Sequence, residues 1–149
     1  MLKQLILSSM IMVLTIAVQA SFISMAMVAL KRMAPWFNKR PHLPRTIIAL
    51  SGVALWLMAA HSINVWLWAG TFFRNDVFST LEEALYFSVV SFTTLGFGDV
   101  LLPQEWRLLA GLCAANGLLI FGLSTAFLVE FYSRLMRLQK GLNETLLGR

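Results

Sequence analysis

The stretch that decides the fold of this chain reads Thr93-Thr94-Leu95-Gly96-Phe97-Gly98-Asp99. It follows an apolar run typical of a short helix, residues 84–92, and it precedes a long uncharged run. Glycine adopts backbone angles that other L-residues resist. Gly96 and Gly98 therefore allow successive carbonyl groups to point to one side, toward a shared axis. A row of carbonyl oxygens arranged in this way can replace the water around a dehydrated cation.

The composition around this stretch predicts an all-α membrane protein. Of the 149 residues 58% are hydrophobic and only 13% are charged, and the mean hydropathy is +0.74. Three runs without charged residues, 4–30, 46–73 and 108–129, each exceed the roughly 20 residues that cross a bilayer core. The uncharged run 84–98 is too short to span and is typical of a re-entrant segment. We expect three transmembrane helices plus one re-entrant helix and loop, in a single domain.

Residues 84–99 resemble the pore loop of potassium channels. The family filter reads Thr-Val-Gly-Tyr-Gly-Asp, with Ile or Leu sometimes in the second place and Phe in the fourth. The run 117–126 is similar to the inner helix of the same family, and the whole resemblance covers residues 46–132. It implies a homotetramer in which four loops form one axial pore. The resemblance thus implies a potassium-selective channel, with K+ as the permeant ion and no cofactor.

The resemblance also assigns roles to residues of the loop. The ion would meet carbonyl oxygens of Thr94, Leu95, Gly96 and Phe97, with the Thr94 hydroxyl at the innermost site and Gly98 completing the filter. The residues expected to support the filter are Thr93, Asp99, Tyr86 and Phe87. We expect the Phe97 side chain to point away from the pore and to pack behind the filter against the last two of these.

Two departures from the family pattern concern the stability of the filter rather than its choice of ion. Phe97 stands where Tyr is common, so it lacks a hydroxyl that can bond to the pore helix. Val90 stands where some members carry a Glu that pairs with the acid at position 99. Asp99 is therefore either bonded to other donors of the pore helix or a solvated loop acid.

Three residues of the inner helix are candidates for a hinge or a cavity. Gly117 matches the family's hinge position, and both a hinge and close helix packing remain open for it. Thr125 matches a cavity-facing position of the family. Asn116 is a polar residue in mid-span, where polar residues usually face a cavity or a partner helix. For Gly122 we favour close packing.

The charges are sorted by membrane side. The loop 31–45 and the tail beyond residue 132 are basic and short, so both should be cytoplasmic. The segment 71–107 carries five acids against two arginines and should face outward. This order places the N-terminus outside and the C-terminus in the cytoplasm, in a plasma membrane or a bacterial inner membrane. The net charge of +5 forms no single patch, so no nucleic-acid partner is expected.

Four segments follow from these patterns. They are an extra N-terminal transmembrane helix (1–30), a basic cytoplasmic or interfacial linker (31–45), an ion channel pore domain (46–132) and a short basic tail (133–149). Pro35, Pro41 and Pro44 break any continuous helix between the first two spans. The linker either controls topology, which we favour, or also binds anionic lipid. A rival interpretation of the first span is a secretory signal with its cleavage site after Val18-Gln19-Ala20.

Several further residues carry expectations that a structure can test. Overlapping capping boxes at residues 79–83 place the start of the pore helix near residue 80. Trp66 and Trp68 are predicted depth markers at the water–lipid boundary. Gln19, His61 and Asn64 should find partners at helix interfaces. Glu130 should pair with Arg134 one turn further on.

Rival functions remain open. A poorly selective cation channel is disfavoured by the intact Gly96-Phe97-Gly98. A potassium transporter subunit is disfavoured because such relatives carry several pore-loop repeats in one chain. A non-conducting regulatory or scaffold subunit would explain the extra first span. No paired catalytic groups appear in the sequence, so we do not expect an enzyme.

Overall fold

The computed structural model describes residues 2–37 and 42–146, with side chains placed for 2–33 and 43–137. Its elements are α1 (Leu2–Phe37), α2 (His42–Arg74), α3 (Leu81–Phe92), the short 3-10 helix η1 (Gln104–Trp106) and α4 (Arg107–Leu146). The described part of the chain contains no strand. The expected all-α membrane fold is confirmed, because Leu2–Met33, Leu43–Arg74 and Gln104–Arg137 are each long and apolar enough to span a bilayer.

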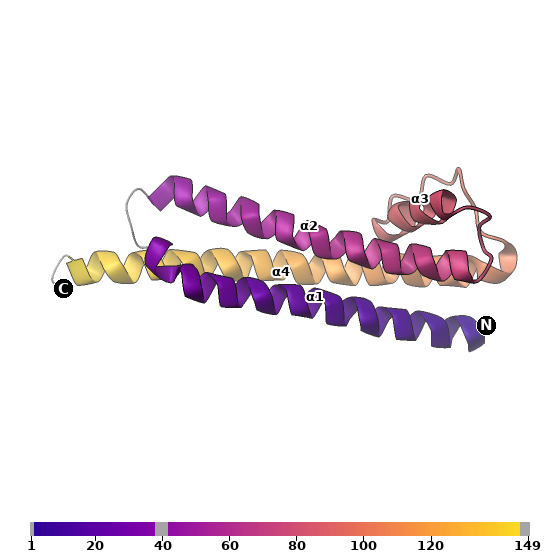
Figure 1. Ribbon diagram of the computed structural model, residues 1–149, viewed down its shortest axis with the longest axis horizontal. Coiled ribbons are helices and arrows are strands. Elements are labelled where there is room, and N and C mark those ends of the chain that lie inside the picture. Colours follow the sequence, from indigo (N-terminus) through magenta and orange to yellow (C-terminus); the bar gives the residue numbers. More distant parts are fainter. Residues whose placement is uncertain (1, 38–41, 147–149) are drawn as a thin grey trace.

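Three long helices lie side by side, and α3 is a short helix packed at one end of them (Figure 1). The N-terminal end of α1, the short α3 and the loops around it lie together at this end, which we call the loop end. The C-terminal parts of α1 and α4 and the N-terminal part of α2 lie at the other end, which we call the basic end. Helix α1 packs against both α2 and α4, and α3 packs against the same two helices.

Helices α1 and α2 extend further into the linker, residues 31–45, than we expected from its prolines. Helix α1 continues through position 35 to Phe37, and α2 begins at His42, so Pro44 lies inside its first turn. The first backbone N–H groups of a helix have no intrahelical partner, so proline is tolerated there. Residues 38–41, which include Pro41, lie outside the described residues. At the other end of the chain the inner helix continues into the tail, because α4 runs to Leu146.

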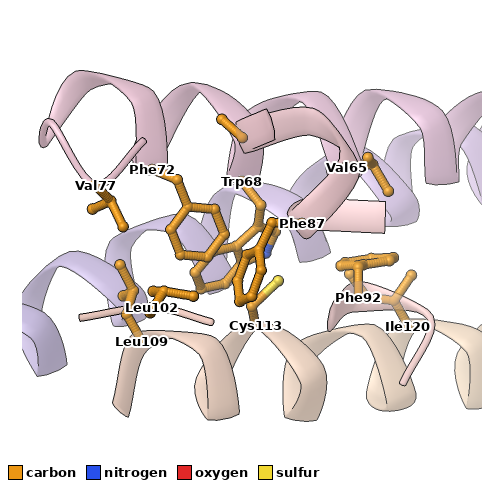
Figure 2. Packing of buried hydrophobic residues seen from close by; sticks show 11 residues of the cluster. Val65, Trp68, Phe72, Val77, Phe87, Phe92, Leu102, Leu109, Cys113 and Ile120 are labelled. Carbon is orange, nitrogen blue, oxygen red and sulfur yellow. The ribbon is translucent and has the colours of Figure 1, made fainter. Parts of the chain in front are cut away.

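An apolar core at the loop end joins α2, α3 and α4 (Figure 2). Trp68 and Phe72 of α2 meet Phe87 of α3 above Leu109 and Cys113 of α4. The prediction that Trp68 marks the water–lipid boundary is wrong, because its side chain is fully buried in this core. Trp66, two positions earlier, is half exposed as a boundary residue would be. Residues two positions apart on a helix do not lie on the same face, so Trp68 can be buried while Trp66 is exposed.

Helix α1 buries several polar side chains against its neighbouring helices. Its fully or nearly buried polar residues in the half toward the loop end are Gln4, Ser8, Thr15 and Gln19. The Gln19 amide donates to the Ser124 hydroxyl of α4 at 2.9 Å and accepts from the Asn64 amide of α2 at 3.3 Å. Lipid offers such groups no partner, so interhelical bonds hold α1 to its own protomer.

Candidate pore loop and its supports

Helix α3 begins where the capping pattern predicted. Thr80 is the N-cap, and its hydroxyl accepts a hydrogen bond from the Glu83 N–H at 3.2 Å. Glu82 and Glu83 stand in the first turn, where negative charge complements the partial positive charge of a helix N-terminus. The helix ends at Phe92, and Thr93 is its C-cap. The partial negative charge of this C-terminal end therefore lies directly before the filter stretch.

A buried serine fastens α3 to α2. The Ser88 hydroxyl, which is fully buried, donates to the Val65 carbonyl at 2.8 Å. On the same face the Phe87 ring packs against Phe72 and Phe78, with centroids 5.3 and 5.2 Å apart. The sequence interpretation missed Ser88, although a polar residue among apolar neighbours in a short helix was a usable signal. These contacts hold the pore helix rigidly at its outer flank.

Gly117 of α4 allows a very close approach of the α3 C-terminus. A Cβ atom at this position would lie 1.8 Å from the Phe92 carbonyl oxygen and 2.7 Å from its carbonyl carbon. Of the two alternatives for Gly117, the protomer therefore displays close packing. The packing predicted for Gly122 is wrong within the protomer, because a Cβ atom there would meet nothing within 4 Å. Gly117 thus sets how near the filter lies to the inner helix.

Left-handed and right-handed backbone conformations alternate along the filter stretch. Thr94, Gly96 and Gly98 have φ values of +61°, +56° and +78°, and the residues between them do not have positive φ. A β-branched residue such as Thr94 rarely adopts this conformation, and such strained residues cluster at functional sites. Alternation of left- and right-handed residues turns successive carbonyl groups to the same side of the chain.

Hydrogen bonds from the end of α3 orient this stretch. The Val90 carbonyl accepts from the Leu95 N–H at 3.0 Å and from the Gly96 N–H at 3.4 Å, and the Thr94 N–H donates to the Ser91 carbonyl at 2.9 Å. The N–H groups of residues 94–96 thus face the end of the pore helix. Within residues 2–37 and 42–146, no hydrogen bond reaches the carbonyls of residues 94–97. These oxygens are available to a ligand.

Tyr86 supports the mouth of the loop. Its hydroxyl donates to the Asp99 carboxylate at 2.5 Å, and the other carboxylate oxygen accepts from the Val100 N–H at 3.0 Å. The Tyr86 hydroxyl holds the pKa of Asp99 below its ordinary value, and the hydrogen bond to Asp99 raises the pKa of Tyr86. Asp99 is therefore bonded to a donor of the pore helix. The Tyr86 hydroxyl supports the loop in place of the polar groups that the family pattern has at positions 97 and 90, where this chain has Phe97 and Val90.

The expected packing of Phe97 is not found in the protomer. Its side chain is 65% exposed, whereas Phe87 is buried on the α2 side of the pore helix. The residues of the loop from Thr94 to Asp99 are all exposed in the single chain. The sequence interpretation placed both aromatic residues behind the filter, but they lie on different faces of α3 and its loop.

The two polar candidates of the inner helix, Asn116 and Thr125, lie in different surroundings. Asn116 is fully buried, and its amide donates to the Thr15 hydroxyl of α1 at 2.8 Å, so it faces a partner helix and not a cavity. The reason is the extra helix α1, which covers that side of α4. Thr125 is exposed, and its hydroxyl donates to the Phe121 carbonyl of its own helix. The predicted pair of Glu130 and Arg134 is confirmed at 2.5 Å.

Three membrane-spanning helices with a re-entrant helix and an oriented carbonyl loop define an integral membrane protein of the pore-loop class. Residues 61–134 match the family model described as "Ion channel", so this part of the chain belongs to the ion channel family. The resemblance to the potassium channel pore family is thereby confirmed at the level of the family. The matched range holds all of α3, the filter stretch and most of α2's outer half and α4.

One curated protein illustrates the relationship at lower coverage. The chain is similar to the potassium voltage-gated channel protein Shal of Drosophila melanogaster, with 30% identity over 60 residues. The alignment covers 39% of this chain and only 10% of the relative. No solved structure matches the chain.

Proposed function

We propose that four copies of this chain form a potassium-selective channel in which the carbonyl oxygens of residues 94–97 conduct K+. The observation that carries the proposal is the positive φ of every second residue, Thr94, Gly96 and Gly98, together with the bonds from the Leu95 and Gly96 N–H groups to the Val90 carbonyl. Carbonyl dipoles that are preorganised in this way replace the hydration shell of a cation. The name of the Shal relative, a potassium channel, favours K+ over other cations.

The homotetramer is part of the proposal. One chain contributes one loop, and a closed ring of carbonyl groups needs several identical subunits around one axis. The exposed side chains of Leu95 and Phe97 would be covered by neighbouring subunits in such a ring. The acidic loop end would face outward and the basic end would face the cytoplasm, following the positive-inside rule. Acids at the outer mouth would raise the local concentration of cations.

The inner helix would line the path below the filter. The Thr125 hydroxyl is exposed in the protomer and would face the central cavity. The C-terminal ends of four pore helices would direct partial negative charge at a cation in that cavity. Transport in this scheme is passive and needs no catalytic group.

The test is ion flux into liposomes that hold the purified tetramer, with K+ compared with Na+. Gly96→Ala places a side chain where φ is +56° and where a Cβ atom meets nothing within 4 Å, so it perturbs backbone conformation without a clash in the protomer. The strain is about 1–2 kcal/mol in each subunit. We expect the wild type to prefer K+ strongly and the variant to lose that preference. Gly111→Ala, in ordinary helical conformation with equal space, is the matched control.

Other outcomes would assign the rival functions. Equal K+ and Na+ flux through the wild type would refute the selective pore and indicate a poorly selective cation channel. Folded tetramers that pass no ions under any tested pH, lipid or tension would indicate a non-conducting regulatory or scaffold subunit. A monomer in detergent and in bilayers would refute the proposed ring.

A further inference from the structure

Helix α1 packs against both of the helices that hold the pore helix. Helix α3 contacts α2 and α4, and α1 contacts the same two helices. Figure 1 shows α1 and α3 on opposite sides of this pair. A polar side chain buried in a span needs a protein partner, since the bilayer supplies none. The bonds from α1 to α2 and α4 therefore also bear on the place where α3 is seated.

The first of these bonds joins α1 to the residue next to Gly117. The Asn116 amide donates to the Thr15 hydroxyl at 2.8 Å, and both side chains are fully buried. A hydrogen bond requires a particular distance and direction, whereas apolar contact is non-directional. The bond therefore fixes how α4 is rotated about its own axis at position 116, and with it the direction in which Gly117 faces.

The rotation of α4 matters here because Gly117 has almost no clearance. A Cβ atom at this position would lie 1.8 Å from the Phe92 carbonyl oxygen, so only the bare face of the glycine fits against the end of α3. Because Cα atoms lie about 2.3 Å from the helix axis, a rotation of about 20° would move them by about 0.8 Å. Functional sites need their groups held within about 0.5 Å. Phe92 lies two positions before Thr94, so such a shift would reach the filter stretch.

A second set of bonds lies one turn further along α1. The Gln19 amide donates to the Ser124 hydroxyl of α4 at 2.9 Å, and its carbonyl oxygen accepts from the Asn64 amide of α2 at 3.3 Å. Asn64 directly precedes Val65, whose carbonyl accepts the bond from Ser88 of the pore helix. Gln19 thus ties α2 to α4 at the level where α2 holds the middle of α3.

Burial of these amides also has a cost. The side-chain carbonyl oxygens of Asn64 and Asn116 are buried, and neither has a hydrogen-bond partner in the part of the chain that the structure describes. A buried polar atom without a partner is unfavourable. This cost offsets part of what the bonds contribute to stability, whereas their effect on the direction of the helices remains.

We infer that α1 is a polar clamp that positions the filter stretch, with Thr15 and Gln19 as the positioning residues. These two side chains do not touch the ion, and they act through α2 and α4. One turn of α1 holds both helices against which α3 is seated, and it keeps Gly117 facing Phe92. This role of α1 rests on the proposed function, because the stretch that it positions is the proposed selectivity filter.

The experiment replaces both partners of one bond by apolar groups of similar shape, Thr15→Val together with Asn116→Leu. The double change leaves no unpaired polar side-chain atom at either position and should be nearly neutral in thermal unfolding. It removes the direction that the bond imposes. Two quantities are measured on the tetramer, namely the rate of amide hydrogen exchange in residues 94–96 and the ratio of K+ to Na+ flux into liposomes.

We expect both quantities to change in the double variant. The Leu95 and Gly96 N–H groups, which donate to the Val90 carbonyl, should exchange roughly three- to twenty-fold faster, the factor that corresponds to one interhelical hydrogen bond in a membrane. The flux ratio should fall by a similar factor. A bond that only stabilises the bundle would change neither quantity in a variant of unchanged thermal stability.

Two controls separate the effect of direction from that of burial. Thr15→Ser keeps the hydroxyl and should leave the exchange rate and the flux ratio unchanged. Thr71→Val with Asn75→Leu makes the same two changes at the end of α2, where both side chains donate to carbonyls of α2 itself, at 2.8 and 2.9 Å. This pair should also leave both quantities unchanged.

Unchanged exchange in residues 94–96 of the Thr15→Val, Asn116→Leu tetramer would overturn the clamp, even if the wild type conducts K+ selectively. Faster exchange with an unchanged flux ratio in a selective channel would overturn it as well. A wild type without preference for K+ refutes the proposed function alone if exchange still becomes faster in the variant. If the double variant does not fold, Gln19→Leu is tested in the same way, with the exposed Ser24→Ala as its control.

Discussion

Replacement of Gly117 by alanine tests how the inner helix holds the filter. The new Cβ atom would stand 1.8 Å from the Phe92 carbonyl oxygen, whereas Cβ contacts shorter than 3.0 Å essentially never occur. The pore helix and the inner helix must therefore separate by more than an ångström. The obstructing atom is backbone, so no side-chain rotation relieves the clash. Phe92 is the last residue of α3, two positions before Thr94, so the displacement is transmitted directly to the filter.

The expected cost follows from overpacking in a close-packed interface. Such insertions destabilise by about 1–3 kcal/mol, against which alanine returns roughly 0.8–1 kcal/mol of helix propensity. Gly122→Ala on the same helix has open space and should be neutral or slightly stabilising. We expect Gly117→Ala to lower the thermal stability of the tetramer and to reduce both K+ flux and its preference over Na+.

The assay compares both variants with wild type by thermal unfolding in detergent and by flux into liposomes. Gly117→Ala tetramers that are as stable and as selective as Gly122→Ala tetramers would refute the packing argument. A variant with unchanged stability and selectivity but an altered open probability would instead support the hinge that the family resemblance implied.

Three further predictions concern the supports of the loop and of α1. Because the bond between Tyr86 and Asp99 lowers the pKa of the acid and raises that of the phenol, its contribution is complete between their ordinary values of 3.8 and 10.0. This contribution is lost as pH falls through the lowered pKa of Asp99 or rises through the raised pKa of Tyr86. Tyr86→Phe should therefore reduce the loss of stability at both ends of a stability–pH profile. A profile that does not change would contradict a stabilising bond between Tyr86 and Asp99. Gln19→Leu removes two interhelical bonds and should cost about 1–2 kcal/mol in thermal unfolding, while the exposed Ser24→Ala should cost less than half of that. Thr80→Ala should lower stability by about 1 kcal/mol through loss of the N-cap, and a smaller loss than for Ser24→Ala would show that the cap is dispensable.

The main features of the fold were readable from local sequence. Uncharged runs of sufficient length indicated the three spans, and the capping pattern at Thr80 placed the pore helix to within a residue. The filter stretch was recognisable because its glycines alternate with apolar residues before an acid. These signals are local, since length, capping and glycine spacing need no knowledge of the neighbouring helices.

Contacts between distant segments were not readable in the same way. Trp68 resembled a boundary residue in sequence, but packing with Phe72 and Cys113 buries it completely. For Asn116 the sequence left a cavity or a partner helix open, and the position of α1 turns its amide toward Thr15. A polar residue in a span indicates that a hydrogen-bond partner is needed, but only the packing of the helices determines which residue that partner is.

The sequence by itself determined the class of the protein, the number of spans and the stretch that we propose as the filter, because hydrophobic length and glycine pattern act locally. Only the tertiary structure decided how that stretch is held. The Val90 carbonyl orients the N–H groups of the filter, Tyr86 braces Asp99, and Gly117 admits the end of α3. Each of these supports joins groups whose distance depends on how the helices pack, and the hydrophobic pattern of one helix does not specify its angle or register against another.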